Sequence, residues 1–174
     1  MPFKVTYKLY EPGKTVPCLT TEDRRIARCE YNDMLRKRGY ALSRLVPTVT
    51  PVEPLTKPEK YLYLVFEVRC LQREYFNHGR NQEVFRQALE KEKQLDNWNA
   101  RTRFHLQGHP KCKPDDEKAF AFFEVVEKWR DVWCKYFAYK KRSDKDPAIE
   151  REMKKQCFDF EKIIDEYITK TIGI

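Results

Sequence analysis

The pattern of apolar and polar residues in the last two thirds of the chain occurs twice. Residues 61–100 form the first copy and residues 122–170 the second. In the first arm the two copies match at an offset of 61 residues: Arg69, Tyr75 and Phe76 correspond to Arg130, Tyr136 and Phe137. In the second arm they match at an offset of 69 residues: Val84, Ala88, Leu89, Glu92, Leu95 and Asp96 correspond to Met153, Cys157, Phe158, Glu161, Ile164 and Asp165. The change of offset places eight additional residues between the two arms of the second copy. We interpret each copy as an antiparallel helical hairpin and the pair as a duplication.

Helix-capping residues support the helical interpretation. The apolar run at 61–68 could by its pattern alone belong to a strand or to a helix. Its counterpart in the second copy follows Pro114 and three acidic residues, which suit the first turn of a helix. Thr56 and Glu59 have the spacing of a capping box. Residues suited to cap two later helices stand at the expected places: Asn81 and Asp146. Two such hairpins can bury each other's apolar faces, which predicts a four-helix assembly.

The first fifty residues show a different pattern. Residues 3–10 alternate between apolar and polar types, which is typical of a half-buried strand. Residues 15–19 and 40–46 are predicted as two further short strands. Thr20, with Asp23 three residues later, marks the predicted start of a helix between them.

Four prolines follow within twelve residues, at positions 47, 51, 54 and 58. Such a stretch is extended and semi-rigid. We therefore interpret residues 51–58 as a connector between a small β-containing module at 1–50 and the helical domain at 59–174. The predicted fold class is α+β, mainly α.

Composition narrows the class of protein. Hydrophobic residues make up 41% of the 174 residues, which is enough for a packed core. The net charge of +8 is concentrated in residues 1–57, where 11 Lys and Arg face 6 Asp and Glu. The six cysteines stand singly, which favours reduced thiols. The sequence shows neither a signal-peptide pattern nor an apolar run of the roughly 18 residues that a membrane span needs. We expect a cytoplasmic protein without membrane contact.

A basic cluster occupies the predicted N-terminal helix, and its members are Arg24, Arg25, Arg28, Arg36, Lys37 and Arg38. Guanidinium groups on one surface can bind the phosphates of a nucleic acid. Acidic residues are interspersed among them, and basic residues near the end of a helix also stabilise it. A solvated helix face and a nucleic-acid site therefore remain alternatives.

A candidate metal site lies between the two copies. His105, His109 and Cys112 follow each other closely, and imidazole and thiolate are ligands that zinc prefers. A structural zinc site needs a fourth ligand, and the sequence offers none at a familiar spacing. A connecting segment that merely contains these residues is the alternative. We expect no cofactor.

The repeated Tyr-Phe pairs at 75–76 and 136–137 are interpreted as core residues, because positions repeated in a hairpin usually serve packing. The basic run at 140–145 could otherwise place aromatic residues beside nucleic-acid bases. Arg69 and Arg130, six positions before each tyrosine, are expected to pair with acidic residues on the facing arm, such as Glu92 or Glu161. No Gly-rich phosphate loop and no HExxH or GxSxG motif occurs. We expect neither an enzyme nor a small-molecule substrate.

Each copy combines R-x5-Y-F, a short turn and an apolar arm that ends in E-x3-D. This pattern resembles small helical-hairpin proteins of uncharacterised function from bacteriophages and mobile elements of gut Bacteroidetes, here doubled. The resemblance covers 61–100 and 122–170 and implies a helical-hairpin architecture with no site residues. Our leading hypothesis is an interaction or accessory protein that acts through helical surfaces, on a protein partner or by self-association. The alternative is nucleic-acid binding by the basic N-terminal module.

Overall fold

The computed structural model describes residues 2–39, 41–77, 79–106 and 114–174, without the side chains of 99–106 and 114–116. These residues form five helices and three strands, which confirms the predicted α+β, mainly α class. They divide into two compact units. The first unit comprises Met1–Leu55 and Ile172–Ile174, and the second comprises Thr56–Thr171.

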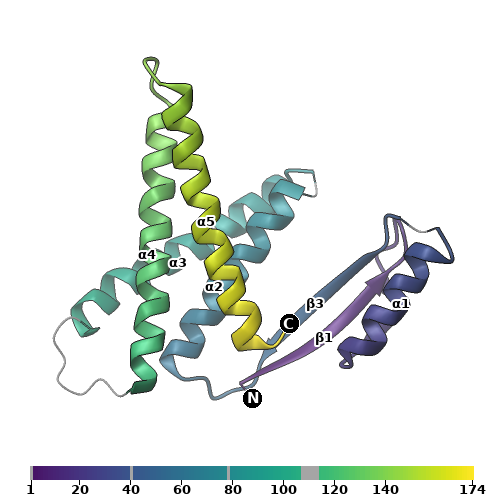
Figure 1. Ribbon diagram of the computed structural model, residues 1–174. Helices are drawn as coiled ribbons and strands as arrows, with labels where there is room; N and C mark the ends of the chain where they lie inside the picture. The colour runs from purple at the N-terminus through teal and green to yellow at the C-terminus, as the bar shows by residue number, and fades with distance from the viewer. Residues whose placement is uncertain (1, 40, 78, 107–113) are drawn as a thin grey trace. The chain divides into compact units, whose positions relative to one another are not determined.

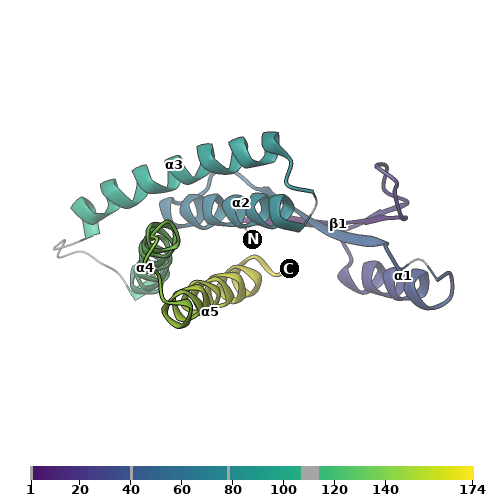
Figure 2. The same ribbon diagram turned by 90° about the horizontal axis from the view of Figure 1, so that it is seen from above.

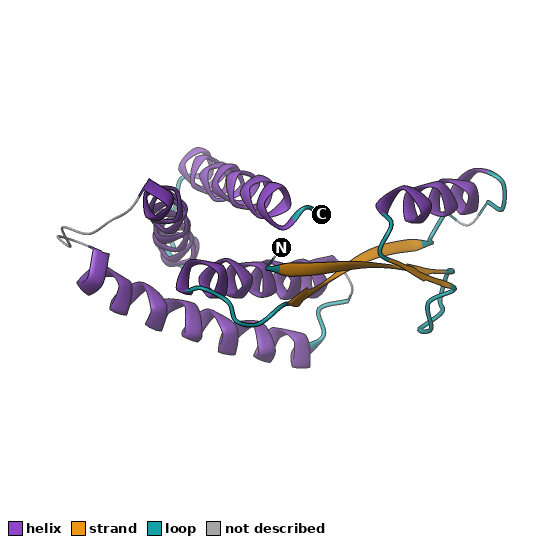
Figure 3. Cartoon of the chain, turned by 90° about the horizontal axis from the view of Figure 1, so that it is seen from below, coloured by secondary structure: helices purple, strands orange, loops and turns teal. Residues whose placement is uncertain are grey.

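The N-terminal unit is a three-stranded antiparallel sheet with one helix. Its strands are β1 (Phe3–Tyr10), β2 (Leu19–Thr21) and β3 (Arg44–Pro51), in the order β2-β1-β3. Helix α1 (Arg24–Arg36) lies along one face of this sheet (Figure 3). Alternate residues of β1, the buried side of α1 and one residue of β3 supply the core, which contains Phe3, Tyr7, Leu9, Ala27, Met34 and Val49.

Two predicted strands are corrected by the structure. The second strand is Leu19–Thr21 and not 15–19, and the third is Arg44–Pro51 and not 40–46. The prolines at 47 and 51 lie within β3, where they pair opposite β1. Proline is tolerated there because β3 is an edge strand, and an edge strand has one side without ladder hydrogen bonds.

The predicted start of α1 and the predicted connector also change. Asp23 and not Thr20 caps α1, since its carboxylate accepts hydrogen bonds from the backbone N–H of Arg25 at 2.7 Å and of Ile26 at 3.3 Å. The border between the two units falls inside 51–58. The connector is nevertheless shorter than predicted, because β3 extends into it at one end and α2 at the other.

The second unit consists of two antiparallel hairpins. The first hairpin is α2 (Lys57–Asn77) with α3 (Gln82–Leu106), and the second is α4 (Pro114–Lys140) with α5 (Pro147–Ile172). The hairpins cross steeply, and their tips point in different directions (Figures 1 and 2). The run at 61–68 is part of α2, so the predicted helix is confirmed.

Three predicted caps are confirmed. The backbone N–H of Thr56 donates to Glu59 Oε2 at 2.7 Å, and the backbone N–H of Glu59 donates to Thr56 Oγ1 at 3.4 Å. Asn81 accepts from the N–H of the second residue of α3 at 2.8 Å. Asp146 accepts from the N–H of the second residue of α5 at 2.7 Å.

Equivalent positions in the two copies are buried alike. Val65 and Val126 are fully buried, as are Leu95 and Ile164. The eight additional residues of the second copy mainly lengthen its helices: two extend α4, four extend α5 and two lengthen the connection. The second hairpin therefore has the same core and a longer tip.

Candidate functional site

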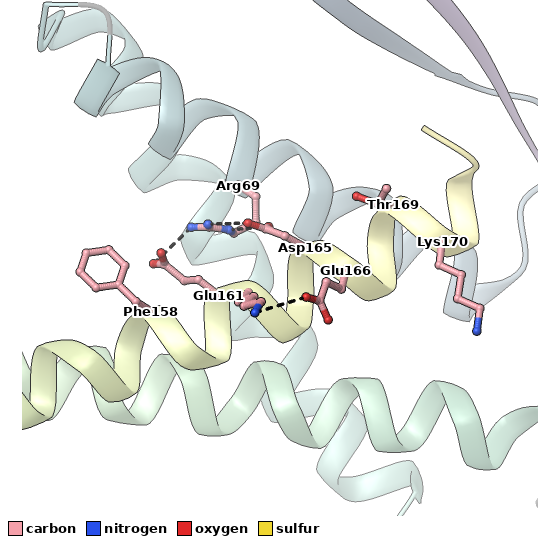
Figure 4. Close-up of a pocket in the computed structure, with 8 residues that line it drawn as sticks. Arg69, Phe158, Glu161, Asp165, Glu166, Thr169 and Lys170 are labelled. Atoms are coloured by element: carbon pink, nitrogen blue, oxygen red, sulfur yellow. Dashed lines mark hydrogen bonds and ion pairs between the residues drawn. The ribbon is translucent and has the colours of Figure 1, made fainter. Parts of the chain in front are cut away.

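Two arginines join the hairpins at their crossing. Arg69 on α2 forms a bidentate pair with Asp165 on α5, with both nitrogen–oxygen distances at 3.0 Å. Its third nitrogen lies 3.2 Å from Glu161 Oε1, one turn away on the same helix (Figure 4). Only 8% of the Arg69 side chain is exposed. This arginine therefore binds the first hairpin to the second through two carboxylates.

The second arginine makes the reciprocal contact. Arg130 on α4 forms a bidentate pair with Asp96 on α3, at 3.2 and 3.1 Å, and lies 3.0 Å from Glu92 Oε2. The predicted pairing of both arginines with acidic residues is confirmed. Each arginine takes its carboxylates from the other copy, which the sequence pattern had not indicated.

A hydrogen-bond chain connects the two arginines. Gln72 accepts a hydrogen bond from Arg69 at 3.0 Å and donates one to Glu92 at 2.8 Å, and Glu92 in turn binds Arg130. The indole of the fully buried Trp129 lies near both guanidinium groups, whose carbons are 5.6 and 6.0 Å from its ring centroid. The crossing is therefore a single polar network around an aromatic centre.

The network favours the charged forms of its members. Burial alone would lower the pKa of Arg69, but its contacts with Asp165 and Glu161 outweigh burial and raise that pKa. Burial alone would raise the pKa of Asp165, but Arg69 and Arg73 outweigh it and lower that pKa. The ion pairs thus stay charged around neutral pH and stabilise the crossing.

The faces that meet at the crossing continue towards the hairpin tips as exposed apolar residues. Phe76 stands seven residues after Arg69, which is two helical turns along the same face, and Phe137 stands seven residues after Arg130. Phe76 is 60% exposed and Phe137 is 48% exposed. The prediction that both phenylalanines belong to the core is therefore wrong, although Tyr136 beside Phe137 is buried.

The other arm of each hairpin repeats this arrangement. Leu89 precedes Asp96 by seven residues and Phe158 precedes Asp165 by seven, and these apolar side chains are 42% and 52% exposed. Figure 4 shows Phe158 on the side of α5 that carries Glu161 and Asp165, in a pocket that these residues line with Arg69. The seven-residue spacing in both copies was the sequence signal for this surface.

We call these exposed side chains the tip faces. The first tip face comprises Phe76, Phe85 and Leu89, and the second comprises Phe137 and Phe158. Phe85 is 40% exposed and precedes Glu92 by seven residues. Its ring lies 5.1 Å from that of Tyr75, which also contacts Phe76 at 5.2 Å. The aromatic rings of the first tip face therefore form a contiguous apolar surface through Tyr75.

The predicted basic cluster is exposed on α1 and around its end. At about 100° per residue, Arg24, Arg25, Arg28 and Arg36 fall within roughly 120° on one side of the helix. Glu30 and Asp33 fall on the other side, and Asp33 pairs with Lys37 at 3.0 Å. In the part of the chain that the structure describes, none of the four arginines has a carboxylate partner. The acidic residues therefore offset the positive charge on the arginine side of α1 less than their positions in the sequence indicated. Arg38 lies beyond the end of the helix.

The candidate metal site falls outside what can be described. His109 and Cys112 lie outside the described residues, as does the side chain of His105. Among the described side chains, no group of three or more His, Cys, Asp or Glu could hold a metal ion.

No helix in the described ranges combines the length and apolar character that crossing a bilayer requires.

No family model matches this chain, and no curated protein or solved structure is significantly similar to it. The resemblance to hairpin proteins of phages and mobile elements therefore stays a prediction.

Proposed function

We propose that this chain is a non-enzymatic interaction protein whose tip faces bind a helical segment of a partner protein. One observation carries the proposal. The hairpin face that packs at the crossing continues to the tip in both copies, where equivalent positions hold exposed apolar side chains: Phe76 with Phe137, and Leu89 with Phe158.

Folding of the unit does not account for this exposure. Half-exposed phenylalanine and leucine side chains leave apolar surface in water, and burying such surface would contribute about 25 cal/mol per Å². Single exposed apolar residues are common on protein surfaces, but contiguous groups of them typically mark interaction sites. An apolar stripe along a helical face is the surface that another amphipathic helix recognises. The tip faces thus support binding of a helical partner.

Site-specific photo-crosslinking tests the proposal in cells that produce the protein. A photoreactive phenylalanine analogue replaces Phe76 in one variant and Phe137 in a second. In a control variant it replaces Ile163, which is 50% exposed on α5 and outside both tip faces. We expect a discrete covalent adduct with a protein from positions 76 and 137 and none from 163. Equal labelling at all three positions, or no adduct at all, would overturn the proposal.

A second candidate function is nucleic-acid binding by α1. The arginine side of this helix supports it, because several cations on one surface without carboxylate partners suit a phosphate backbone. Arg24 and Arg28, one turn apart, would be central to that contact.

Titration against mixed-sequence DNA and RNA at two salt concentrations tests the second candidate. We expect salt-dependent binding that is weakened when Arg24 and Arg28 are both replaced by alanine. A control in which Lys154 and Lys155 on α5 become alanine changes the net charge equally and should bind as wild type. Binding that is insensitive to salt, or equal loss in both variants, would exclude α1 as the site.

A further inference from the structure

The interface at the crossing joins two duplicates of one surface. We propose that the partner on the tip faces is a second copy of this chain, so that the first tip face of one molecule packs on the second tip face of the other. This inference rests on the proposed function and names its partner.

Contacts at the crossing show that the hairpin face is complementary to its own duplicate. Tyr61 and Phe122 are equivalent residues, and their rings meet edge to face at 6.1 Å. The two arginines exchange carboxylates between the copies, as corresponding residues do in a two-fold interface. A surface that binds its duplicate within one chain can bind the same duplicate in another.

The tip faces continue this interface without a change of face. Each lies two helical turns beyond the residues that form the ion pairs, in the same seven-residue register. The steep crossing brings the hairpins together along only part of their length and leaves the tips apart (Figure 2). The remaining part of each face is therefore exposed within its own chain.

A reciprocal arrangement uses both tip faces of both molecules. The first tip face of one copy meets the second tip face of the other, and a two-fold axis generates the same contact again. Two equal contacts close the assembly as a dimer. The chemistry at each contact is apolar, with Phe76, Phe85 and Leu89 on one side and Phe137 and Phe158 on the other.

The mass of the full-length protein in solution tests this inference. Light scattering after size exclusion, at about 100 µM chain, detects contacts with micromolar dissociation constants. We expect twice the 21.1 kDa of one chain, falling towards 21.1 kDa on dilution. Replacing Phe137 and Phe158 with serine should raise the dimer dissociation constant at least tenfold, and so should replacing Phe76 and Leu89 with serine.

Ile163→Ser is the matched control, because Ile163 is as exposed as Phe158 on the same helix but lies on another face. It should dimerise as wild type, and circular dichroism should show that all variants are folded. A wild-type monomer, a dimer unaffected in both tip variants, or a dimer broken by Ile163→Ser would overturn the inference. A monomer that still crosslinks to another protein from position 137 overturns only the second-copy partner. A monomer without any adduct overturns the proposed function as well.

Discussion

The side chain of Arg69 illustrates how a buried charge is tolerated in this protein. It is almost fully buried, yet two carboxylates, one amide oxygen and the ring of Trp129 surround its guanidinium group. A buried ion pair is stable only when its hydrogen-bonding groups are satisfied, because taking two charges out of water costs several kcal/mol. The completeness of the network is therefore more important than any one of its contacts.

Removing Arg69 should be costly. In an Arg69→Leu variant, Asp165 and Glu161 lose their buried cation, and we expect the free energy of unfolding to fall by about 3–5 kcal/mol. Arg73 also contacts Asp165, at 2.7 Å, but its side chain is 52% exposed. An Arg73→Leu control should lose at most about 1 kcal/mol. Urea denaturation measures both, and equal losses would contradict a special role for the buried arginine.

Asp165 should make the stability depend on pH in a defined window. Its pKa in the folded protein lies below the ordinary value of about 3.9, because the arginines outweigh burial. The resulting stabilisation is complete above that ordinary value and is lost as the pH falls through the folded pKa. The stability difference between wild type and Asp165→Asn should therefore shrink below about pH 4. Urea denaturation from pH 7 to pH 2.5 measures it, and a constant difference would contradict this account.

At the scale of elements, the helices of the second unit could be predicted and the short strands could not. A helix cap, such as Thr56 with Glu59 or Asp146 before a proline, depends on hydrogen bonds between residues that are close in sequence. Whether Pro47 can stand in a strand depends on the position of that strand in the sheet, which is a property of distant residues. β3 is an edge strand, and two of the four prolines that indicated a connector, Pro47 and Pro51, lie within it.

The cap of α5 gives a prediction at this scale. Asp146→Ala removes the side-chain acceptor for the N–H of Ala148 in the first turn of the helix and should lower the free energy of unfolding by about 1 kcal/mol. Asp144→Ala is the control, since Asp144 only pairs with exposed Arg142 at 2.7 Å and should change stability by less than about 0.5 kcal/mol. Thermal and urea unfolding test this, and the reverse order of the two losses would exclude Asp146 as the important cap.

At the scale of the molecule, the duplication predicted the hairpins but not the way in which they meet. The offsets of 61 and 69 residues identify equivalent positions in the two copies. Which carboxylates pair with each arginine depends on the crossing of the hairpins, because the crossing places each arginine against the other copy. The same geometry explains why Phe76 and Phe137 were misassigned to the core. Repetition indicated correctly that they share a face, but the crossing covers that face only in part.

Because one network spans both hairpins, the second unit should open as a whole. Trp129→Ala removes the aromatic centre, and the loss of a large core side chain costs about 3–5 kcal/mol. Amide hydrogen exchange should then increase by about two or more orders of magnitude in all four helices together, since these amides exchange through the same opening. The amides of β1 and α1 should keep their protection, because no member of the network lies in the N-terminal unit. Ile163→Ala, on α5 but half-exposed and outside both tip faces, should leave exchange at the crossing unchanged. Loss of protection confined to α4 and α5 would show that the hairpins are stable separately, and that the reciprocal ion pairs do not couple their folding.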